Sequence, residues 1–182
     1  MFFRTANYTA FYVDEPFSES NLGANTAKDF VYYNMLRAWK AKDPSFPFIN
    51  AHDKTYSVRD DSDWETTLKP RLHERLKASK NIILFLSSIT ASSRALREEI
   101  DYGINVCGLP VIAVYPDYKK FDILSERKLK GLWDKLPVFR DSKSKVAVLH
   151  IPFDKDLICN ALKNQDFQVR TMKNPGDYFV WL

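Results

Sequence analysis

Glycine and cysteine are scarce in this sequence, and it has no long apolar run. The 182 residues include 5 glycines and 2 cysteines. The sequence shows no Gly-rich phosphate loop and no dinucleotide fingerprint, and so few glycines could hardly supply one. Cys107 and Cys159 lie far apart among apolar neighbours, which predicts reduced thiols and no disulfide. No Cys/His cluster has the ligand spacing of a zinc site, so no metal is expected.

The charge balance is nearly even, with 27 basic and 23 acidic residues. A net charge of +4 is too small to argue for a nucleic-acid partner. No apolar run approaches the about 20 residues of a membrane span, and the N-terminus lacks the apolar core of a signal peptide. We therefore expect a cytoplasmic protein without nucleic-acid or membrane partners. The length predicts one domain over 1–182, with its core at about 5–165 and a tail at 166–182.

Strand-like and helix-like segments alternate along the chain, which predicts an α/β fold. Strands are expected at residues 6–13, 46–51, 81–87, 109–115 and 145–151. Helices are expected at 26–42, from 62 through 76 with an interruption at Pro70, around 98–99 up to Gly108, over 119–135 and over 153–164. This alternation requires right-handed crossovers and a parallel sheet. We predict a three-layer sandwich whose five-stranded parallel sheet has the flavodoxin-like order 2-1-3-4-5, with the tail as an edge hairpin or a packed segment.

The stretch from Ser87 to Ile104 is the most informative part of the chain. It follows a buried strand and predicts a polar loop and then an amphipathic helix that carries Glu98 and Glu99. Helical geometry separates these two acids. Glu98 points away from the apolar stripe and has Arg94 four residues earlier, which favours a solvated ion pair. Glu99 lies at the border of the stripe, as either an ordinary boundary acid or a catalytic acid. The stripe itself is formed by Leu96, Ile100, Ile104 and Cys107.

Four segments of the chain resemble a known family. They are residues 34–40, residues 51–53 with 59–60, residues 68–80, and residues 87–100 followed by 109–112. In their order and spacing these segments are similar to TIR-like domains of the bacterial Thoeris anti-phage type, over about residues 5–150. The resemblance implies a TIR fold and an activity that consumes NAD as a substrate, with no further cofactor.

The resemblance also implies a site. A glutamate immediately before an isoleucine, on the helix after the third strand, acts at the ribose in such enzymes, and Glu99 holds that position. The end of the first strand, Phe11 to Asp14, is expected to border the nucleotide cleft. Ser87 is expected at the same rim. The loop that contains His52 and Asp53 is expected to cover the pocket from the other side.

Several of these positions have a structural alternative. His52 is equally compatible with a hydrogen-bonded structural histidine, and Asp53 with a loop residue that bonds its own backbone. Arg59 suits either a pyrophosphate contact or a surface salt bridge. The loop 14–25 is long for the family and fits either a lid or a solvated insertion, and the tail has no counterpart in the family.

Glycosidic cleavage of NAD is the reaction that the resemblance implies. Nicotinamide leaves as a neutral ring, so the enzyme has mainly to stabilise an oxocarbenium-like ribose, for which a carboxylate is suited. The expected product is a linear, cyclic or conjugated ADP-ribose that acts on a separate effector protein after a phage-derived trigger, with a homo-oligomer left open. Two rival classes are a non-catalytic TIR-type assembly module and a phosphoryl receiver, for which Asp14 and Glu15 supply paired acids but no suitable lysine follows the fifth strand.

Overall fold

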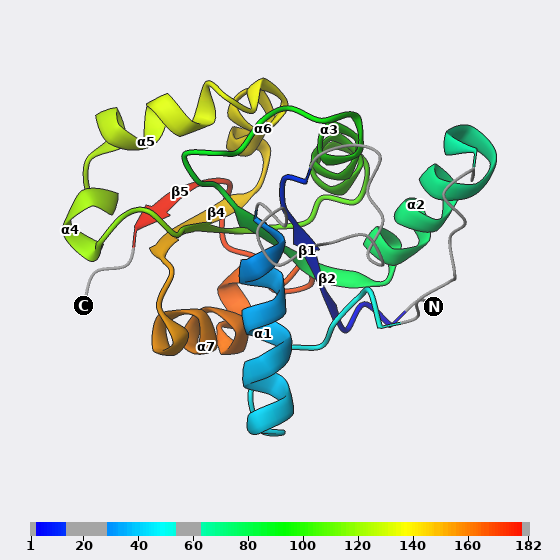
Figure 1. Cartoon of the computed structure of the whole chain (residues 1–182), viewed down its shortest axis with the longest axis horizontal. Helices are drawn as coiled ribbons and strands as arrows, with labels where there is room; N and C mark the ends of the chain where they lie inside the picture. The colour runs from blue at the N-terminus through cyan, green and yellow to red at the C-terminus, as the bar shows by residue number, and fades with distance from the viewer. Residues whose placement is uncertain (1–2, 14–28, 54–62, 180–182) are drawn as a thin grey trace.

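The computed structural model describes residues 3–13, 29–53 and 63–179 of the chain. They form a five-stranded, all-parallel sheet in the order β1-β2-β3-β4-β5, with helices on both faces (Figure 1). The strands are β1 (Ala6–Ala10), β2 (Ser79–Phe85), β3 (Val111–Tyr115), β4 (Ala147–Pro152) and β5 (Gly176–Phe179). The α-helices are α1 (Phe30–Lys42), α2 (Lys69–Lys77), α3 (Arg94–Asp101), α4 (Lys120–Ile123), α5 (Glu126–Trp133), α6 (Pro137–Ser142) and α7 (Lys155–Lys163). The shorter helical turns are η2 (Trp64–Leu68), η3 (Tyr102–Val106), η4 (Lys143–Lys145) and η5 (Gln165–Phe167). The predicted α/β class and parallel sheet are confirmed.

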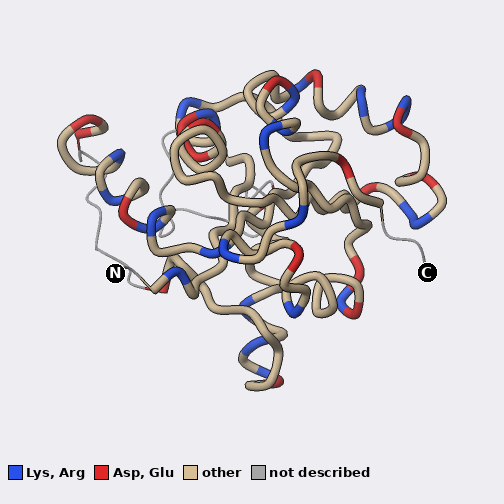
Figure 2. Tube along the Cα trace, turned by 180° about the vertical axis from the view of Figure 1, so that it is seen from behind, with Lys and Arg blue, Asp and Glu red and all other residues tan. Residues whose placement is uncertain are grey.

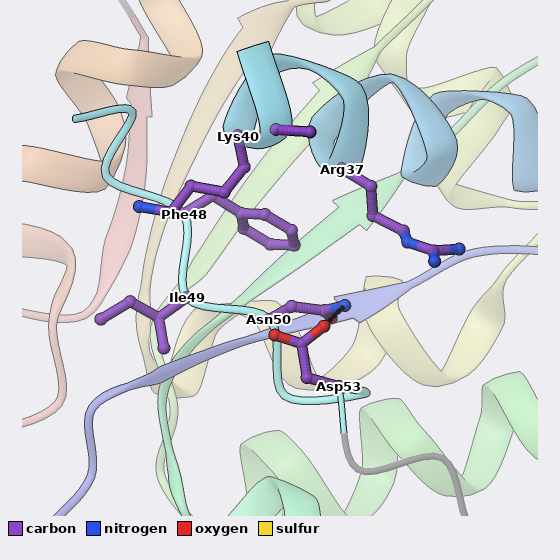
Figure 3. Close-up of a pocket in the computed structure, with 7 residues that line it drawn as sticks. Arg37, Lys40, Phe48, Ile49, Asn50 and Asp53 are labelled. Carbon is purple, nitrogen blue, oxygen red and sulfur yellow. Dashed lines mark hydrogen bonds between the residues drawn. The ribbon is translucent and has the colours of Figure 1, made fainter. Parts of the chain in front are cut away.

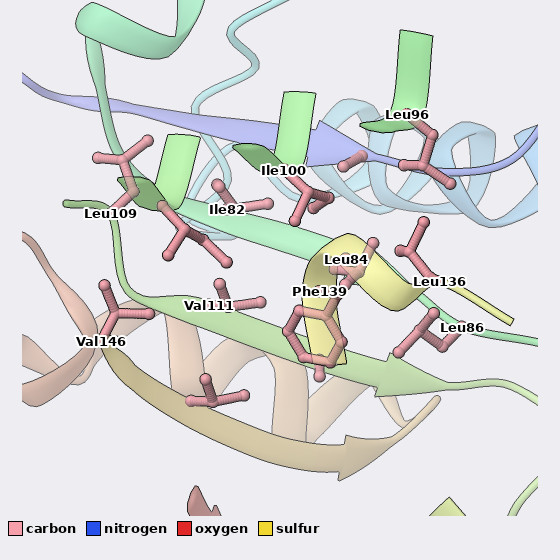
Figure 4. Packing of buried hydrophobic residues seen from close by; sticks show 14 of the residues in the cluster. Ile82, Leu84, Leu86, Leu96, Ile100, Leu109, Val111, Leu136, Phe139 and Val146 are labelled. Atoms are coloured by element: carbon pink, nitrogen blue, oxygen red, sulfur yellow. The ribbon is translucent and has the colours of Figure 1, made fainter. Parts of the chain in front are cut away.

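The sheet separates two layers of helices. α1 and α7 cover one face, and α2, α3, α5 and α6 cover the other (Figure 1). β3 is buried along its whole length and β2 along most of it, because each lies between the two layers. Ile82, Leu84 and Val111 pack toward α3 and α6 (Figure 4). Ile83 and Ile112, at the alternate positions, belong to the cluster on the α1 side.

The segment predicted as the second strand, 46–51, lies beside β1 but is not a regular strand. It forms a single parallel bridge, between Asn7 and Asn50. The Asn7 N–H donates to the Ile49 carbonyl at 2.6 Å, and the Asn7 side-chain oxygen accepts the Ile49 N–H at 2.8 Å. The strand prediction is wrong here for two reasons. The Asn7 side chain, and not a backbone carbonyl, accepts the Ile49 N–H. Pro47 has no N–H to donate to a neighbouring strand. The segment does occupy its predicted place on the open side of β1.

The fifth strand of the sheet comes instead from the tail. β5 pairs in parallel with β4 and places Phe179 opposite His150, so the tail does not form the hairpin that was one of its two predicted states. Asp177 accepts a hydrogen bond from His150 Nε2 at 2.9 Å and pairs with Lys143. These contacts to distant residues hold a four-residue strand that local sequence hardly indicates.

The helix that carries Glu99 follows its prediction closely. Ser93 caps α3 by accepting the Leu96 N–H, and the apolar stripe of the helix is buried. The helix then widens into the π-helical turn η3 and ends at Gly108, whose φ is +63°. Gly103 lies inside η3, where a Cβ would come within 2.5 Å of Ile82 Cδ1. A larger residue at this turn would therefore require the buried Ile82 side chain to move.

Two other helical predictions need adjustment. Ser62, predicted to open the helix before α2, lies outside the described residues, and Asp63 caps the π-helical turn η2 by accepting the Thr66 N–H at 2.7 Å. Pro70 lies in the first turn of α2, as its predicted interruption of the helix requires. The basic segment 119–135 is divided into α4 and α5.

Charged residues of both signs are spread over the described part of the chain. Figure 2 shows basic and acidic positions interspersed over the helices and loops. Among the described residues, no helix combines the length and the apolar character that crossing a membrane demands. Cys107 and Cys159 are both free thiols.

Candidate active site

Glu99 is held against the edge of the sheet by a tyrosine. Leu96 and Ile100 anchor α3 in the core, and this orientation directs Glu99 toward β1. There the Tyr8 hydroxyl donates a hydrogen bond to Glu99 Oε1 at 2.8 Å. Tyr8 is almost fully buried, and burial followed by the Glu99 carboxylate raises the pKa of its phenol well above the usual value. Tyr8 is therefore a permanent hydrogen-bond donor to this carboxylate.

Glu98 has different partners from those predicted. Its carboxylate bonds His73 Nε2 at 2.7 Å and lies 3.9 Å from Lys69 Nζ, both on α2. The predicted ion pair with Arg94 is wrong, because the Arg94 guanidinium lies 4.5 Å from the centre of the Trp64 ring. The aromatic face of η2 offers Arg94 a cation–π contact, while α2 supplies cations to Glu98. Glu98 thus joins α2 to α3.

His52 lies beside Tyr8, on the open side of β1. Its Nε2 donates to the Thr9 carbonyl at 3.1 Å, and its ring centre is 4.7 Å from that of Tyr8 and 5.7 Å from that of Tyr33. Its Nδ1 is 3.5 Å from Arg75 Nη1. Burial, reinforced by the positive charge of Arg75, lowers the pKa of His52 to about 4. His52 is therefore neutral at pH 7, with Nδ1 as its acceptor, and it fixes the 51–53 turn against β1.

Asp53 and Asn50 form the wall of a surface cavity. Asn50 Nδ2 donates to Asp53 Oδ1 and to the Tyr33 hydroxyl, each at 2.8 Å, and Asn50 Oδ1 accepts the His52 N–H at 3.0 Å. The cavity has a volume of about 320 Å³ and lies between α1 and the 46–53 segment (Figure 3). Its lining consists of Arg37, Lys40, Ala41, Phe48, Ile49, Asn50 and Asp53. Of the predicted site residues that the structure describes, Asp53 lines this cavity and Glu99 does not.

Phe11 and Ser87 are held by contacts with α1 and its N-cap residue. Phe11 is half-buried on the α1 side of the sheet, where it stacks on Tyr33 with ring centres 5.3 Å apart. Ser87 is buried at the end of β2 and donates its hydroxyl to Asp29 at 2.6 Å. Thr90 also donates to Asp29, whose pKa is raised mainly by burial. Ser87 thus ties the loop before α3 to the start of α1.

Two predicted positions, Asp14 and Arg59, fall outside the described residues. Two residues at the centre of the site, Tyr8 and Arg75, were not predicted. Alternation along β1 puts Tyr8 on one face, but only the tertiary arrangement shows that α3 covers that face. In the described ranges, no group of three or more His, Cys, Asp or Glu side chains is placed to hold a metal ion.

The arrangement links Glu99 to Tyr8, Tyr8 to the His52 ring and His52 to Arg75. A carboxylate held in one orientation suits the stabilisation of positive charge on a bound substrate. The family model described as Thoeris protein ThsB, TIR-like domain, matches residues 8–121, which include all four of these residues. The match covers more than half of the chain, and the protein belongs to the family of Thoeris ThsB TIR-like domains.

Proposed function

We propose that this anti-phage TIR-like domain is an enzyme that cleaves the bond between nicotinamide and ribose in NAD. The observation that carries the proposal is the Glu99 carboxylate. It lies at the border of the apolar stripe of α3, and the Tyr8 hydroxyl bonds one of its oxygens. The family to which the chain belongs supports a role in anti-phage defence. A fold alone does not define a reaction, so the proposal rests on the position and chemistry of this one acid.

Glu99 is proposed to stabilise the cationic ribose as the glycosidic bond breaks. Nicotinamide leaves as a neutral ring, so the leaving group needs no proton. The electron pair of the C–N bond goes to the nicotinamide nitrogen, and a nucleophile then adds at the anomeric carbon. Water gives linear ADP-ribose, whereas a nucleophile from the substrate itself gives a cyclic isomer.

The product is proposed to act as a signalling nucleotide that activates a separate effector protein. Turnover by the isolated protein is expected to be slow, because a phage-derived trigger is proposed to switch the activity on. His52, whose ring lies beside Tyr8, is proposed to border the substrate as a neutral ring. Phe11, Asp14, Asp53 and Ser87 are the other positions proposed to border the substrate.

The test is to incubate the purified protein with NAD, with and without lysate from phage-infected cells, and to identify the products by mass spectrometry. Loss of NAD with release of nicotinamide is the expected result. If NAD is never consumed under any trigger, the enzymatic proposal fails and the non-catalytic assembly module replaces it. Rapid turnover at several per second without a trigger would contradict the switch but not the chemistry.

A further inference from the structure

Tyr8 combines almost complete burial with a polar group that has a specific partner. Its ring is 1% exposed and belongs to the core on the α3 side of the sheet. A buried hydroxyl without a partner is costly, and the phenol donates to Glu99 Oε1 at 2.8 Å. A phenylalanine would fill the same space and bury no polar atom. The hydroxyl is therefore a polar group in the core whose contact is made with the proposed catalytic acid.

We propose that Tyr8 is a positioning residue for Glu99: its phenol holds the carboxylate in one orientation and favours the ionised form. This inference rests on the proposed function and adds a residue to it. A hydrogen bond donated to a carboxylate stabilises the charged form and so lowers the pKa of the acid. A donor fixed in advance also removes the need to reorganise the site during the reaction.

Tyr8 is well fixed for such a role. Its strand is hydrogen-bonded to β2, with Tyr8 opposite Ile82, and its ring is flanked by His52 at a centroid distance of 4.7 Å. His52 is held in turn by the Thr9 carbonyl. The phenol therefore has little freedom to move away from Glu99, and a displacement of α3 would have to break this bond.

Other charged groups lie on the elements that pack against Tyr8 and α3. The positive charge of Arg75 of α2 lowers the pKa of both Tyr8 and His52 in part. On α2, His73 and Lys69 are engaged by Glu98, the charged neighbour of Glu99 on its own helix. On α6, which also packs against α3, the charged pair Arg140 and Asp141 bond each other, and Arg140 also bonds Asp134. The hydroxyl of Tyr8 is an uncharged donor to Glu99, and a single substitution can remove it.

The test is Tyr8→Phe, with Tyr115→Phe as the matched control. Both tyrosines are fully buried, and the Tyr115 hydroxyl bonds His150 and Trp133 at the β3–β4 side of the sheet. Each variant loses one buried hydroxyl and keeps its ring. For Tyr8→Phe we expect NAD turnover at pH 7 to fall about tenfold or more, and the acidic limb of the pH profile to move up by about one unit. Tyr115→Phe is expected to leave the pH profile in place even if it unfolds at a lower temperature.

A second readout does not depend on turnover. The Glu99 side-chain carboxyl can be titrated by carbon NMR in the wild type and in both variants. We expect its pKa to rise in Tyr8→Phe and to stay constant in Tyr115→Phe. An unchanged Glu99 pKa in Tyr8→Phe overturns the inference, as does an unchanged pH profile in an active enzyme. If the wild type never consumes NAD, the proposed function fails, while the titration still decides whether Tyr8 controls the ionisation of Glu99.

Discussion

Glu98 and Glu99 are adjacent on α3, but their carboxylates bond to different elements of the fold. Glu98 bonds His73 of α2 at 2.7 Å, and Glu99 bonds Tyr8 of β1 at 2.8 Å. The first contact joins two partly buried side chains of neighbouring helices, and the second reaches an almost completely buried side chain of the sheet. A change to glutamine at Glu98 therefore tests the contact between α2 and α3, and the same change at Glu99 tests the proposed chemistry.

Glu99→Gln is expected to abolish NAD consumption, whereas Glu98→Gln is not. Glutamine keeps the size of the side chain but removes the charge that would stabilise a cationic ribose. A loss of about 10²-fold or more in rate is expected at Glu99. At Glu98 the amide can still bond His73, so folding and turnover should stay close to wild type. The rates are compared under conditions in which the wild type is active. Near-normal turnover by Glu99→Gln would show that the catalytic assignment is wrong.

Replacing His52 by glutamine should weaken the dependence of stability on pH. The pKa of His52 is lowered from 6.5 to about 4 in the folded protein, so the unfolded chain binds this proton more tightly. The contribution of neutral His52 to the free energy of unfolding is fully present above pH 6.5. As the pH falls toward 4, this contribution is lost, by up to about 3 kcal/mol. The free energy of unfolding, measured by urea denaturation from pH 7 to pH 4, should fall less steeply in His52→Gln. Identical slopes in both proteins would contradict the buried, neutral state of His52.

Asp177→Asn should destabilise the protein and leave NAD turnover intact. Asp177 bonds the buried His150 and Lys143, and together these contacts hold β5 on β4. Loss of the charge is expected to reduce the free energy of unfolding by about 1–3 kcal/mol. β5 and β1 are the outermost strands of the sheet, so the Glu99 region should not sense the change. Urea denaturation and an NAD assay on the same sample give the comparison. A parallel loss of turnover at a pH where the variant is folded would link β5 to the site.

Two glycine-to-alanine substitutions are expected to have opposite effects. At Gly103 a methyl group would lie 2.5 Å from Ile82 Cδ1 and 3.3 Å from Leu76 Cδ2, so the core has to shift at a cost of about 1–3 kcal/mol. At Gly131, in α5, no atom lies within 4 Å of the new methyl group. There alanine should stabilise the helix by about 0.5–1 kcal/mol. Thermal unfolding of both variants gives the signs directly. A stabilised Gly103→Ala would mean that η3 packs less tightly against β2.

The sequence predicted features that depend on periodicity. The buried runs of β2 and β3 and the apolar stripe of α3 follow from residue spacing, and this spacing selected Glu99 over Glu98 as the acid to consider. The alternation of strands and helices, through the flavodoxin-like order, placed the 46–51 segment beside β1. Its failure to form a strand depends on the Asn7 side chain, which accepts the Ile49 N–H and which no local pattern reveals.

The errors concern contacts between elements that are distant in the sequence. The Glu98–Arg94 pair was predicted from one helix alone. In the structure Glu98 bonds His73 of α2, and Arg94 lies over Trp64 of η2. β5 depends on His150 and Lys143, more than 25 residues earlier. Tyr8 could not be connected to Glu99 because their contact spans 91 positions. Such pairs follow from the packing of helices on the sheet, which single-sequence patterns do not encode.

The two rims of the sheet are short or irregular among the described residues. β5 presents only four residues at one rim, and at the other the 46–51 segment contains Pro47 and makes a single bridge. Short edges and prolines are poor templates for adding a strand from another molecule. We therefore expect any assembly to form through helix and loop side chains, and continuous cross-molecular sheets to be disfavoured. The same rims should make the folded sheet a poor seed for fibrils.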